Sequence, residues 1–374
     1  MANNNDKKVL NVPALRFPEF SGEWKSKFIN DLASVVSGGT PDTSVKSFWN
    51  GNIQWFTPSE IGKNKYVDSS LRTITEEGLN NSSAKLLPPH TILLSSRATV
   101  GECSLSLKEC ATNQGFQSLI AQSCDTNFLY YLIQTKKKDL IRKACGSTFL
   151  EISANEVRKI QVKIPYDNEQ KKIADFLSLI DERIFTQNKI IEKLKSLIKG
   201  ITILLTTKGK PNTTIAQCLE CHSSTLQESD VSHSELYKVF GANGLIGYTD
   251  MPQMNGDAIL IIKDGSGVGT TSYAQGEFSV IGTLNYLTAI SNYDLRYLYF
   301  VLSVFNFQSY KTGMAIPHIY FKDYGNAKIY CPPLSEQKRI ANVLGKLESK
   351  LYLEQNILAS FNLQKRYLLG QMFI

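Results

Sequence analysis

The residues whose types and spacing could bind a metal ion or attach a haem lie at 218–222, where Cys218, Cys221 and His222 form a C-x-x-C-H string. Such a string begins a zinc site when a second pair of ligands follows it. The sequence holds no second C-x-x-C and no H-x-x-x-H. The seven cysteines are odd in number and mostly isolated. Reduced thiols are therefore expected, with a metal or haem site as the minor alternative.

A glycine-rich segment, GSGVG at 265–269, could cradle phosphates. It follows the apolar run AILII, but the next stretch, TTSYAQGEFSVI, has the pattern of a strand and not of the helix that a dinucleotide loop requires. A hairpin is therefore expected. No P-loop occurs, and the Pro-Pro pairs at 87–90 and 331–334 lack the flanking groups of an adenine-methyltransferase loop.

The remaining candidates for catalysis are scattered. The four histidines, His90, His222, His233 and His318, are far apart in the sequence, and no serine or cysteine lies in a nucleophile motif. We therefore expect no catalytic residue and no cofactor site in this chain.

Basic residues slightly outnumber acidic ones, 41 to 34, which gives a formal charge of +7. This excess is compatible with a polyanionic partner but does not establish one. The densest cluster comprises Lys136, Lys137, Lys138, Arg142 and Lys143, on an expected amphipathic helix that carries Phe128, Leu132, Leu140 and Ile141 on its other side. Two interpretations of this cluster remain: it contacts phosphates, or it is a helix face exposed to solvent.

No apolar signal region occurs in the first twenty residues, and no uncharged run of about 18 apolar residues occurs anywhere. The sequence therefore predicts a cytoplasmic protein without membrane contact.

An internal repeat positions these residues. Residues 146–207 align without a gap with 313–374, an offset of 167. PYDNEQKKIADFL at 165–177 matches PPLSEQKRIANVL at 332–344 in seven of thirteen positions. The same offset pairs Tyr130 with Tyr297 in two aromatic segments, and places TILLSSRATVG at 91–101 beside AILIIKDGSGVG at 258–269 with a one-residue slip. The repeat is thus a whole domain followed by a helix.

Each repeat ends in a long predicted helix of about 38 residues, roughly 57 Å. Asn168 and Ser335 are the expected N-caps. Apolar residues then recur at steps of three and four, with polar breaks at Gln187 and Glu354 and one departure at Lys365. This coiled-coil seam comprises Ile173, Leu177, Ile180, Ile184, Ile191 and Leu194 in the first helix and Ile340, Leu344, Leu347, Leu351, Leu358 and Phe361 in the second.

Chain order predicts that the two helices pair in opposite directions, because the second domain begins directly after the first helix and leads into the second. The alternative is that each helix packs on its own domain or on another chain. An antiparallel pair would carry two similar domains related by approximate two-fold symmetry, about 50 Å apart. That separation suits two patches on one duplex about 15 base pairs apart.

The two helix starts, 168–174 and 335–341, resemble the conserved helices of Type I restriction-modification specificity subunits. The segments SGGTP at 37–41, WFTPSEI at 55–61, LLSSRATVG at 93–101, TNQGF at 112–116 and GSTFLEIS at 146–153 resemble the first target-recognition domain of that family. GANGLIGY at 241–248, GSGVG and IGTLNYL at 281–287 resemble the second.

The resemblance implies sequence-specific binding of double-stranded DNA, with one half-site for each domain and a spacer set by the helices. It also implies two methyltransferase subunits and restriction subunits as partners. In the family, S-adenosylmethionine, ATP, Mg²⁺ and the active sites belong to those partners, so this chain is expected to be non-catalytic.

Residues for DNA contact are expected on loops, where lysine and arginine bind phosphates and polar side chains bind base edges. Turn chemistry or a solvated surface is the competing explanation for each. The first domain offers Lys63, Asn64, Lys65, Ser95, Ser96, Arg97, Asn113, Gln114, Lys136, Lys137 and Lys138. The second offers Asn243, Lys263, Asp264, Thr270, Thr271, Lys311 and His318.

The expected fold class is mixed α/β: two similar recognition domains and an antiparallel coiled coil. The expected segments are a first domain over 1–166, a helix over 167–207, a second domain over 208–333 and a helix over 334–374. Two other functions stay open. A scaffold that displays two ligand-binding domains would have no DNA affinity, and an enzyme with unrecognised catalytic residues would show turnover in the isolated chain.

Overall fold

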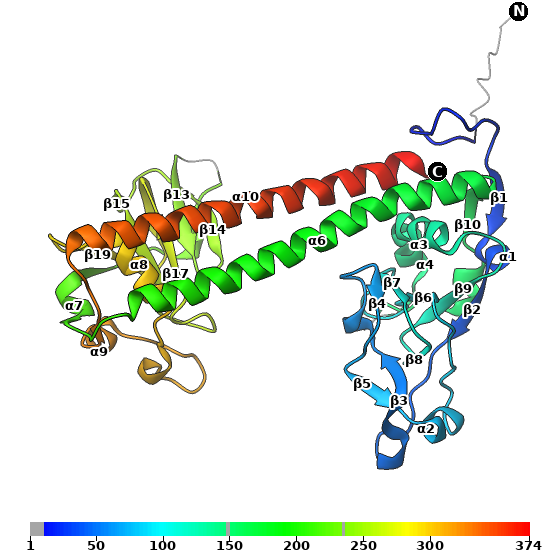
Figure 1. Cartoon of the computed structure of the whole chain (residues 1–374), viewed down its shortest axis with the longest axis horizontal. Coiled ribbons are helices and arrows are strands. Elements are labelled where there is room, and N and C mark those ends of the chain that lie inside the picture. The colour runs from blue at the N-terminus through cyan, green and yellow to red at the C-terminus, as the bar shows by residue number, and fades with distance from the viewer. Residues whose placement is uncertain (1–10, 147–149, 234–235) are drawn as a thin grey trace, which may run out of the picture. The chain divides into compact units, whose positions relative to one another are not determined.

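The computed structural model describes residues 11–146, 150–233 and 236–374. These residues form two compact units (Figure 1). Unit 1 comprises the chain up to Asn188 together with Ile357–Ile374, and unit 2 comprises Lys189–Asn356. Each unit therefore holds one globular domain and parts of both long helices. The four segments expected from the sequence divide the chain in order along its length, whereas the two units are divided by contacts in space. The four-segment division therefore stays a prediction.

Unit 1 contains three small sheets. The largest has the strand order β2-β9-β6-β7-β4, the second β5-β3-β8, and the third pairs β1 with β10. The strands are β1 (Lys25–Phe28), β2 (Ala33–Ser37), β3 (Trp49–Phe56), β4 (Tyr66–Val67), β5 (Arg72–Ile74), β6 (Ile92–Leu94), β7 (Cys103–Ser106), β8 (Cys110–Thr112), β9 (Gln117–Ala121) and β10 (Gln161–Ile164). The short helices are α1 (Ile29–Leu32), α2 (Glu76–Asn80), α3 (Thr126–Thr135), α4 (Lys137–Lys143) and α5 (Ala154–Arg158).

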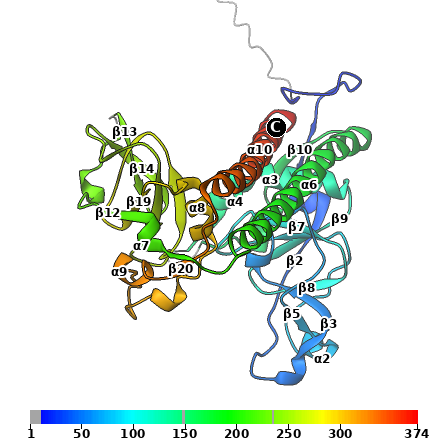
Figure 2. The ribbon, with the colours of Figure 1, turned by 60° about the vertical axis from the view of Figure 1, so that its left-hand side comes forward.

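Unit 2 repeats this plan (Figure 2). Its sheets have the orders β12-β19-β16-β17, β14-β13-β18-β15 and β11-β20. The strands are β11 (Thr213–Thr214), β12 (Leu219–Ser223), β13 (Tyr237–Gly241), β14 (Gly244–Thr249), β15 (Met254–Asn255), β16 (Ala258–Ile262), β17 (Thr271–Ala274), β18 (Glu277–Val280), β19 (Leu284–Ala289) and β20 (Lys328–Ile329). The short helices are α7 (Ile215–Cys218), α8 (Leu295–Ser303) and α9 (Phe321–Tyr324).

The mixed α/β prediction is confirmed, and its clearest basis in the sequence is the central strand of each unit. Every residue of β6 and of β16 is buried, as their unbroken apolar runs require. β16 pairs with β17 in antiparallel register, so the segment GSGVG lies in a hairpin as predicted. The predicted basic helix is in fact two helices, since α3 ends at Thr135 and α4 begins at Lys137.

The two long helices are α6 (Asp167–Thr206) and α10 (Leu334–Met372), of 40 and 39 residues. Within unit 1 the first part of α6 packs on the last part of α10, and Asp181 forms an ion pair with Lys365 at 2.7 Å. Within unit 2, Ile201 and Leu205 of α6 share a core with the first turns of α10. The helices are therefore antiparallel in each unit. None of the twelve predicted seam residues is exposed.

The predicted N-caps are wrong by one or two positions, because the helices begin at Asp167 and Leu334 and already include Asn168 and Ser335. The repeated glutamines bond there instead. Gln170 Nε2 donates to Pro165 O (2.9 Å) and its Oε1 accepts from Asp125 N (3.0 Å). Gln337 makes the same bonds to Pro332 O (2.8 Å) and Asp294 N (2.9 Å). Each glutamine thus joins a long helix to the N-cap of a short one.

Those two N-caps also correct one pairing in the repeat. Asp125 caps α3 and Asp294 caps α8 in the same way, each accepting a 2.8 Å bond from the main chain three residues later. The offset at this point is therefore 169, and Tyr130 corresponds to Tyr299 instead of Tyr297. A two-residue insertion before α8 accounts for the difference.

Candidate nucleic-acid interface

Main-chain hydrogen bonds bring together the loops that carry most of the predicted contacts in unit 1. Ser96 N donates to Gly115 O at 2.8 Å, which joins the loop after β6 to the turn before β9. Gly39 N donates to Thr112 O at 2.8 Å, and Ile152 N donates to Ser96 O at 3.0 Å. Loops that are far apart in the sequence therefore form one surface, held by the buried strands beneath it.

Arg97 lies on this surface and forms an ion pair with Glu151 at 2.9 Å. The side chains are 47% and 39% exposed. The main chains of the two residues also form an antiparallel bridge. Arg97 is thus accessible, and its side chain is held by a carboxylate whose own main chain is fixed.

Three residues predicted to contact DNA are buried, and for these the prediction is wrong. Ser95 and Ser96 are fully buried, and Ser95 Oγ donates to Arg97 O at 3.1 Å within its own loop. Lys65 is 9% exposed. A buried side chain cannot meet a phosphate or a base edge, so these residues lie beneath the candidate surface and are not part of it.

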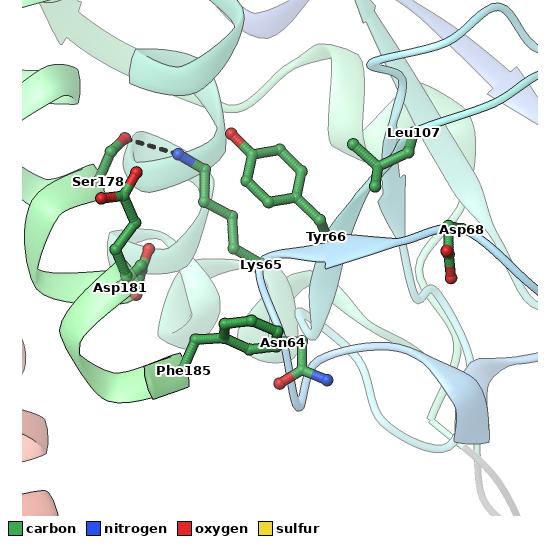
Figure 3. Close-up of a pocket in the computed structure, with 9 residues that line it drawn as sticks. Asn64, Lys65, Tyr66, Asp68, Leu107, Ser178, Asp181 and Phe185 are labelled. Carbon is green, nitrogen blue, oxygen red and sulfur yellow. Dashed lines mark hydrogen bonds between the residues drawn. The ribbon is translucent and has the colours of Figure 1, made fainter. Parts of the chain in front are cut away.

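The ammonium group of Lys65 points at helix α6 (Figure 3). Its Nζ donates to Ser178 Oγ at 2.7 Å, and it lies 4.9 Å from the centre of the Tyr131 ring. Tyr131 Oη donates to Asp181 Oδ2 at 2.6 Å, and Asp181 pairs with Lys365. Burial lowers the pKa of Lys65 to about 8, although the charge of Asp181 opposes this shift. Lys65, Tyr131, Ser178, Asp181 and Lys365 form what we call the helix-anchor cluster.

The helix-anchor cluster borders a cavity of about 440 Å³ between the domain and α6. Lys65, Ser178 and Asp181 lie at its polar end, and Tyr66, Leu107 and Phe185 supply much of its apolar surface (Figure 3). The cluster therefore attaches the first domain to the long helix and belongs to the scaffold.

The other predicted contacts of unit 1 are partly accessible. Lys63, Asn64 and Gln114 are exposed, whereas Asn113 is half-buried and its Oδ1 accepts from Gly115 N at 2.9 Å. In the lysine cluster, Lys136 Nζ donates to Ile374 O at 3.2 Å, and burial lowers its pKa. Lys137 pairs with Glu102, and Lys138 is exposed. Of these three lysines, Lys136 and Lys137 are therefore bound to other parts of the unit, and Lys138 faces solvent.

Unit 2 places an acid where unit 1 places Arg97. Asp264 follows β16, and its Oδ1 lies 2.7 Å from Nδ1 of His318, while its Oδ2 pairs with Lys263. Burial alone would raise the pKa of Asp264, but the bonds from Lys263 and His318 outweigh it, and that pKa lies below its usual value. Three residues predicted from the sequence thus form one network.

The remaining predicted residues of unit 2 occupy two places. Asn243 is exposed in the turn between β13 and β14. Thr270, Thr271 and Lys311 line an open hollow of about 380 Å³ together with Asn306 and Gln308. Polar donors and acceptors surround this hollow, as an interface with base edges or phosphates requires.

The C-x-x-C-H string is divided by the local fold. Cys218 ends α7 and lies 3.9 Å from the thiol of Cys331. His222 lies on β12, stacks on Tyr286 and is 2.9 Å from Thr288 Oγ1 through its Nε2. Across residues 11–146, 150–233 and 236–374, no group of three or more His, Cys, Asp or Glu side chains is arranged to hold a metal ion.

Two sets of residues were not identified from the sequence. Glu151, the partner of Arg97, was not singled out, although its position is 167 before His318, just as that of Arg97 is 167 before Asp264. The residue type thus changes at both positions, from Arg and Glu in the first repeat to Asp and His in the second, and this joint change was a signal that the sequence contained. Asp181 and Tyr131 were also missed. The sequence named two other members of their cluster, Lys65 as a DNA contact and Lys365 as a departure from the seam, without indicating that they lie together.

A family model described as the Type I restriction modification DNA specificity domain matches residues 21–196 and 222–362. The specificity subunit of Type I restriction enzyme MjaIX of Methanocaldococcus jannaschii is 36% identical over 180 residues, which are 46% of this chain and 42% of that relative. The chain thus matches less than half the length of that relative. The EcoprrI specificity subunit of Escherichia coli is 24% identical over 360 residues, 87% of this chain and 88% of the relative.

Among solved structures, the S subunit of a Type I restriction-modification system from M. genitalium has a TM-score of 0.64 to this chain. It is 18% identical, and the match covers 97% of this chain and 99% of that one. At this identity the likeness concerns the fold. No helix in the described parts of the chain combines the length and the apolar composition that a membrane crossing needs.

Proposed function

Because the chain belongs to the family of Type I restriction-modification DNA specificity domains, we propose that it is the specificity subunit of such a complex and binds double-stranded DNA at a bipartite target. Each unit contacts one half-site, and the long helices set the unspecified spacer. The observation that carries this proposal is the repeated domain, which presents polar loops on two copies of one buried framework.

The partners are two methyltransferase subunits, and restriction subunits join the same assembly. Both long helices support this part of the proposal, since apolar side chains lie exposed on them: Leu179, Leu197, Leu204, Tyr352, Leu353, Leu363 and Tyr367 are each more than half exposed. Apolar side chains exposed on a helix surface favour burial against another protein. The catalytic residues and the sites for S-adenosylmethionine, ATP and Mg²⁺ lie in the partners, and the assembly is cytoplasmic.

The proposed DNA contacts are taken from the predicted residues that are exposed or partly exposed. In unit 1 they are Lys63, Asn64, Arg97, Gln114 and Lys138, and in unit 2 they are Asn243, Asp264, Thr270, Thr271 and Lys311, with His318 holding the carboxylate of Asp264. Lysines contact phosphates, and the polar side chains on the gathered loops contact base edges.

The test is to assemble the chain with methyltransferase partners encoded beside it, and to map methylated bases across a bacterial genome that lacks other methyltransferases. The expected result is one motif of two short half-sites separated by a fixed number of unspecified base pairs. Methylation without sequence preference, or a complex that binds cognate and random duplexes equally, contradicts the proposal.

Neutralising Lys138 tests a phosphate contact separately. The Lys138→Gln complex should lose affinity equally for specific and random DNA, and the slope of log K against log salt should fall by about one. Lys136→Gln is the matched control, because Lys136 is held by the main chain at Ile374. An unchanged slope for Lys138→Gln removes this lysine from the interface.

A further inference from the structure

The two units share a main-chain framework around the pairs Arg97–Glu151 and Asp264–His318. Cys145 and Glu151 exchange two main-chain hydrogen bonds of 2.9 Å, and Thr312 and His318 exchange two of 2.9 and 2.7 Å. In unit 1, Ile152 N donates to Ser96 O at 3.0 Å, and in unit 2, Ile319 N donates to Lys263 O at 3.0 Å. Every one of these positions is related to its counterpart by the offset of 167.

On this common framework the residue on the loop after the central strand has opposite charge in the two units. Unit 1 has a cation on the loop after its central strand β6 and an acid opposite it, at 2.9 Å. Unit 2 has an acid on the equivalent loop after β16 and a histidine opposite it, at 2.7 Å. Because the main chain is the same, the side chains alone make the two surfaces chemically different.

Neither pair uses up the bonding capacity of its members. A guanidinium has five N–H donors, and the ion pair with Glu151 engages one nitrogen of Arg97. A carboxylate has about four acceptor positions, of which His318 and Lys263 engage one on each oxygen of Asp264. Each pair therefore orients a side chain that can still bond to a ligand.

The chemistry of base edges makes opposite demands on these side chains. Guanine presents two acceptors in the major groove, which arginine binds in a bidentate manner. Cytosine and adenine present an amino group there, and this group can donate a hydrogen bond to a carboxylate. Arg97 is thus suited to guanine, and Asp264 to the amino group of cytosine or adenine.

We propose that the pairs Arg97–Glu151 and Asp264–His318 are the equivalent base-recognition positions of the two units, and that the opposite charges of Arg97 and Asp264 give the two half-sites opposite hydrogen-bonding requirements at one base pair. This inference rests on the proposed function and assigns its specificity to named residues. Arg97 and Asp264 contact the base, and Glu151 and His318 are positioning residues.

The experiment transplants the pair of unit 2 into unit 1 as Arg97→Asp/Glu151→His, within the complex that contains the methyltransferase partners. The control reverses another exposed ion pair of unit 1, Lys172–Glu19, which lies at 2.7 Å with side chains 52% and 46% exposed. Its variant is Lys172→Glu/Glu19→Lys. For each complex, methylated motifs are mapped, and affinities are measured for the wild-type target and for a random duplex.

The transplanted variant should keep the spacer and the half-site of unit 2, change one base pair in the half-site of unit 1, and bind the original target about 5- to 150-fold more weakly. Binding to the random duplex should change far less, and the control should keep the whole motif. An unchanged motif in the transplanted variant overturns the inference.

A second variant guards against a folding defect. Arg97→Lys keeps the charge and the pair with Glu151 but removes bidentate geometry. It should relax the requirement at the same base pair without altering the melting temperature. Retention of full specificity refutes the assignment of Arg97. A wild-type complex without any bipartite motif refutes the proposed function itself, which separates the two failures.

Discussion

The ammonium group of Lys65 illustrates how a residue of suitable type can be unsuited to DNA contact. Lysine after an exposed turn is a reasonable phosphate ligand, and Lys63 and Asn64 beside it are exposed. The side chain of Lys65 instead enters the helix-anchor cluster, where burial lowers its pKa from 10.5 to about 8. Between these two values the unfolded chain holds a proton that the folded chain does not, so this residue makes stability rise with pH.

Replacing Lys65 by Met should therefore have an effect that depends on pH. The difference in unfolding free energy between Lys65→Met and the wild type should shift by about 2 kcal/mol in favour of the wild type between pH 7 and pH 9.5. Denaturant unfolding at several pH values measures it. Lys172→Met, which removes a half-exposed lysine, should show little change, and a flat difference for Lys65→Met would mean that its ammonium is well solvated.

Residue types predicted loops correctly but not which side chains are accessible. Arg97 and Gln114 are accessible, whereas Ser95 and Ser96 on the same or an adjoining loop are fully buried. All four are polar residues in loops, and their accessibility depends on main-chain bonds to distant segments, such as that from Ser96 N to Gly115 O. Such long-range bonds leave no local pattern in a single sequence.

At the scale of elements, the long helices were predictable because an apolar residue at every third or fourth position requires a partner surface. The residues at which these helices begin and the role of Lys365 were not predictable from the sequence. The repeated segments at 165–177 and 332–344 do include Gln170 and Gln337, but their bonds to Asp125 and Asp294 depend on tertiary structure. Lys365 interrupts the seam because Asp181 lies opposite it.

The pair Asp181–Lys365 should show strong coupling, since both side chains are less than one-fifth exposed. Asp181→Asn removes the carboxylate that pairs with Lys365 and favours the charged form of the buried Lys65, and it should destabilise the protein by about 3 kcal/mol. Asp181→Leu/Lys365→Leu restores an apolar seam and should cost much less. Chemical unfolding of both variants, with exposed Asp175→Asn as the control, measures this, and equal costs for the two would exclude coupling.

The repeated glutamines should contribute equally in the two units. Gln170→Ala and Gln337→Ala each leave a part-buried main-chain amide and a buried carbonyl without a partner, so each should cost about 1–3 kcal/mol. Hydrogen exchange at Asp125 and Asp294 localises the effect, because each amide should lose protection only in its own variant. Loss of protection at both amides in either variant would argue against independent contacts.

At the scale of the molecule, the proposed spacer depends on helix length. Inserting seven residues at matched positions of α6 and α10 preserves the seam and adds about 10 Å to each helix. If the helices set the spacer, the recognised gap should grow by about three base pairs while both half-sites stay the same. Mapping of methylated motifs measures the gap, and a folded, active variant with an unchanged gap would contradict this role.

If the chain has the proposed function, the framework common to the two units lets one half of the target change without the other. Side chains at the four positions differ between units while the main-chain bonds around them are retained. Alternatives at the two halves then combine freely, so the number of attainable targets is the product of the choices at each half. Under that function, a lineage that carries this chain acquires a new address for its DNA marking through a pair of coordinated codon changes, with the rest of the assembly left untouched.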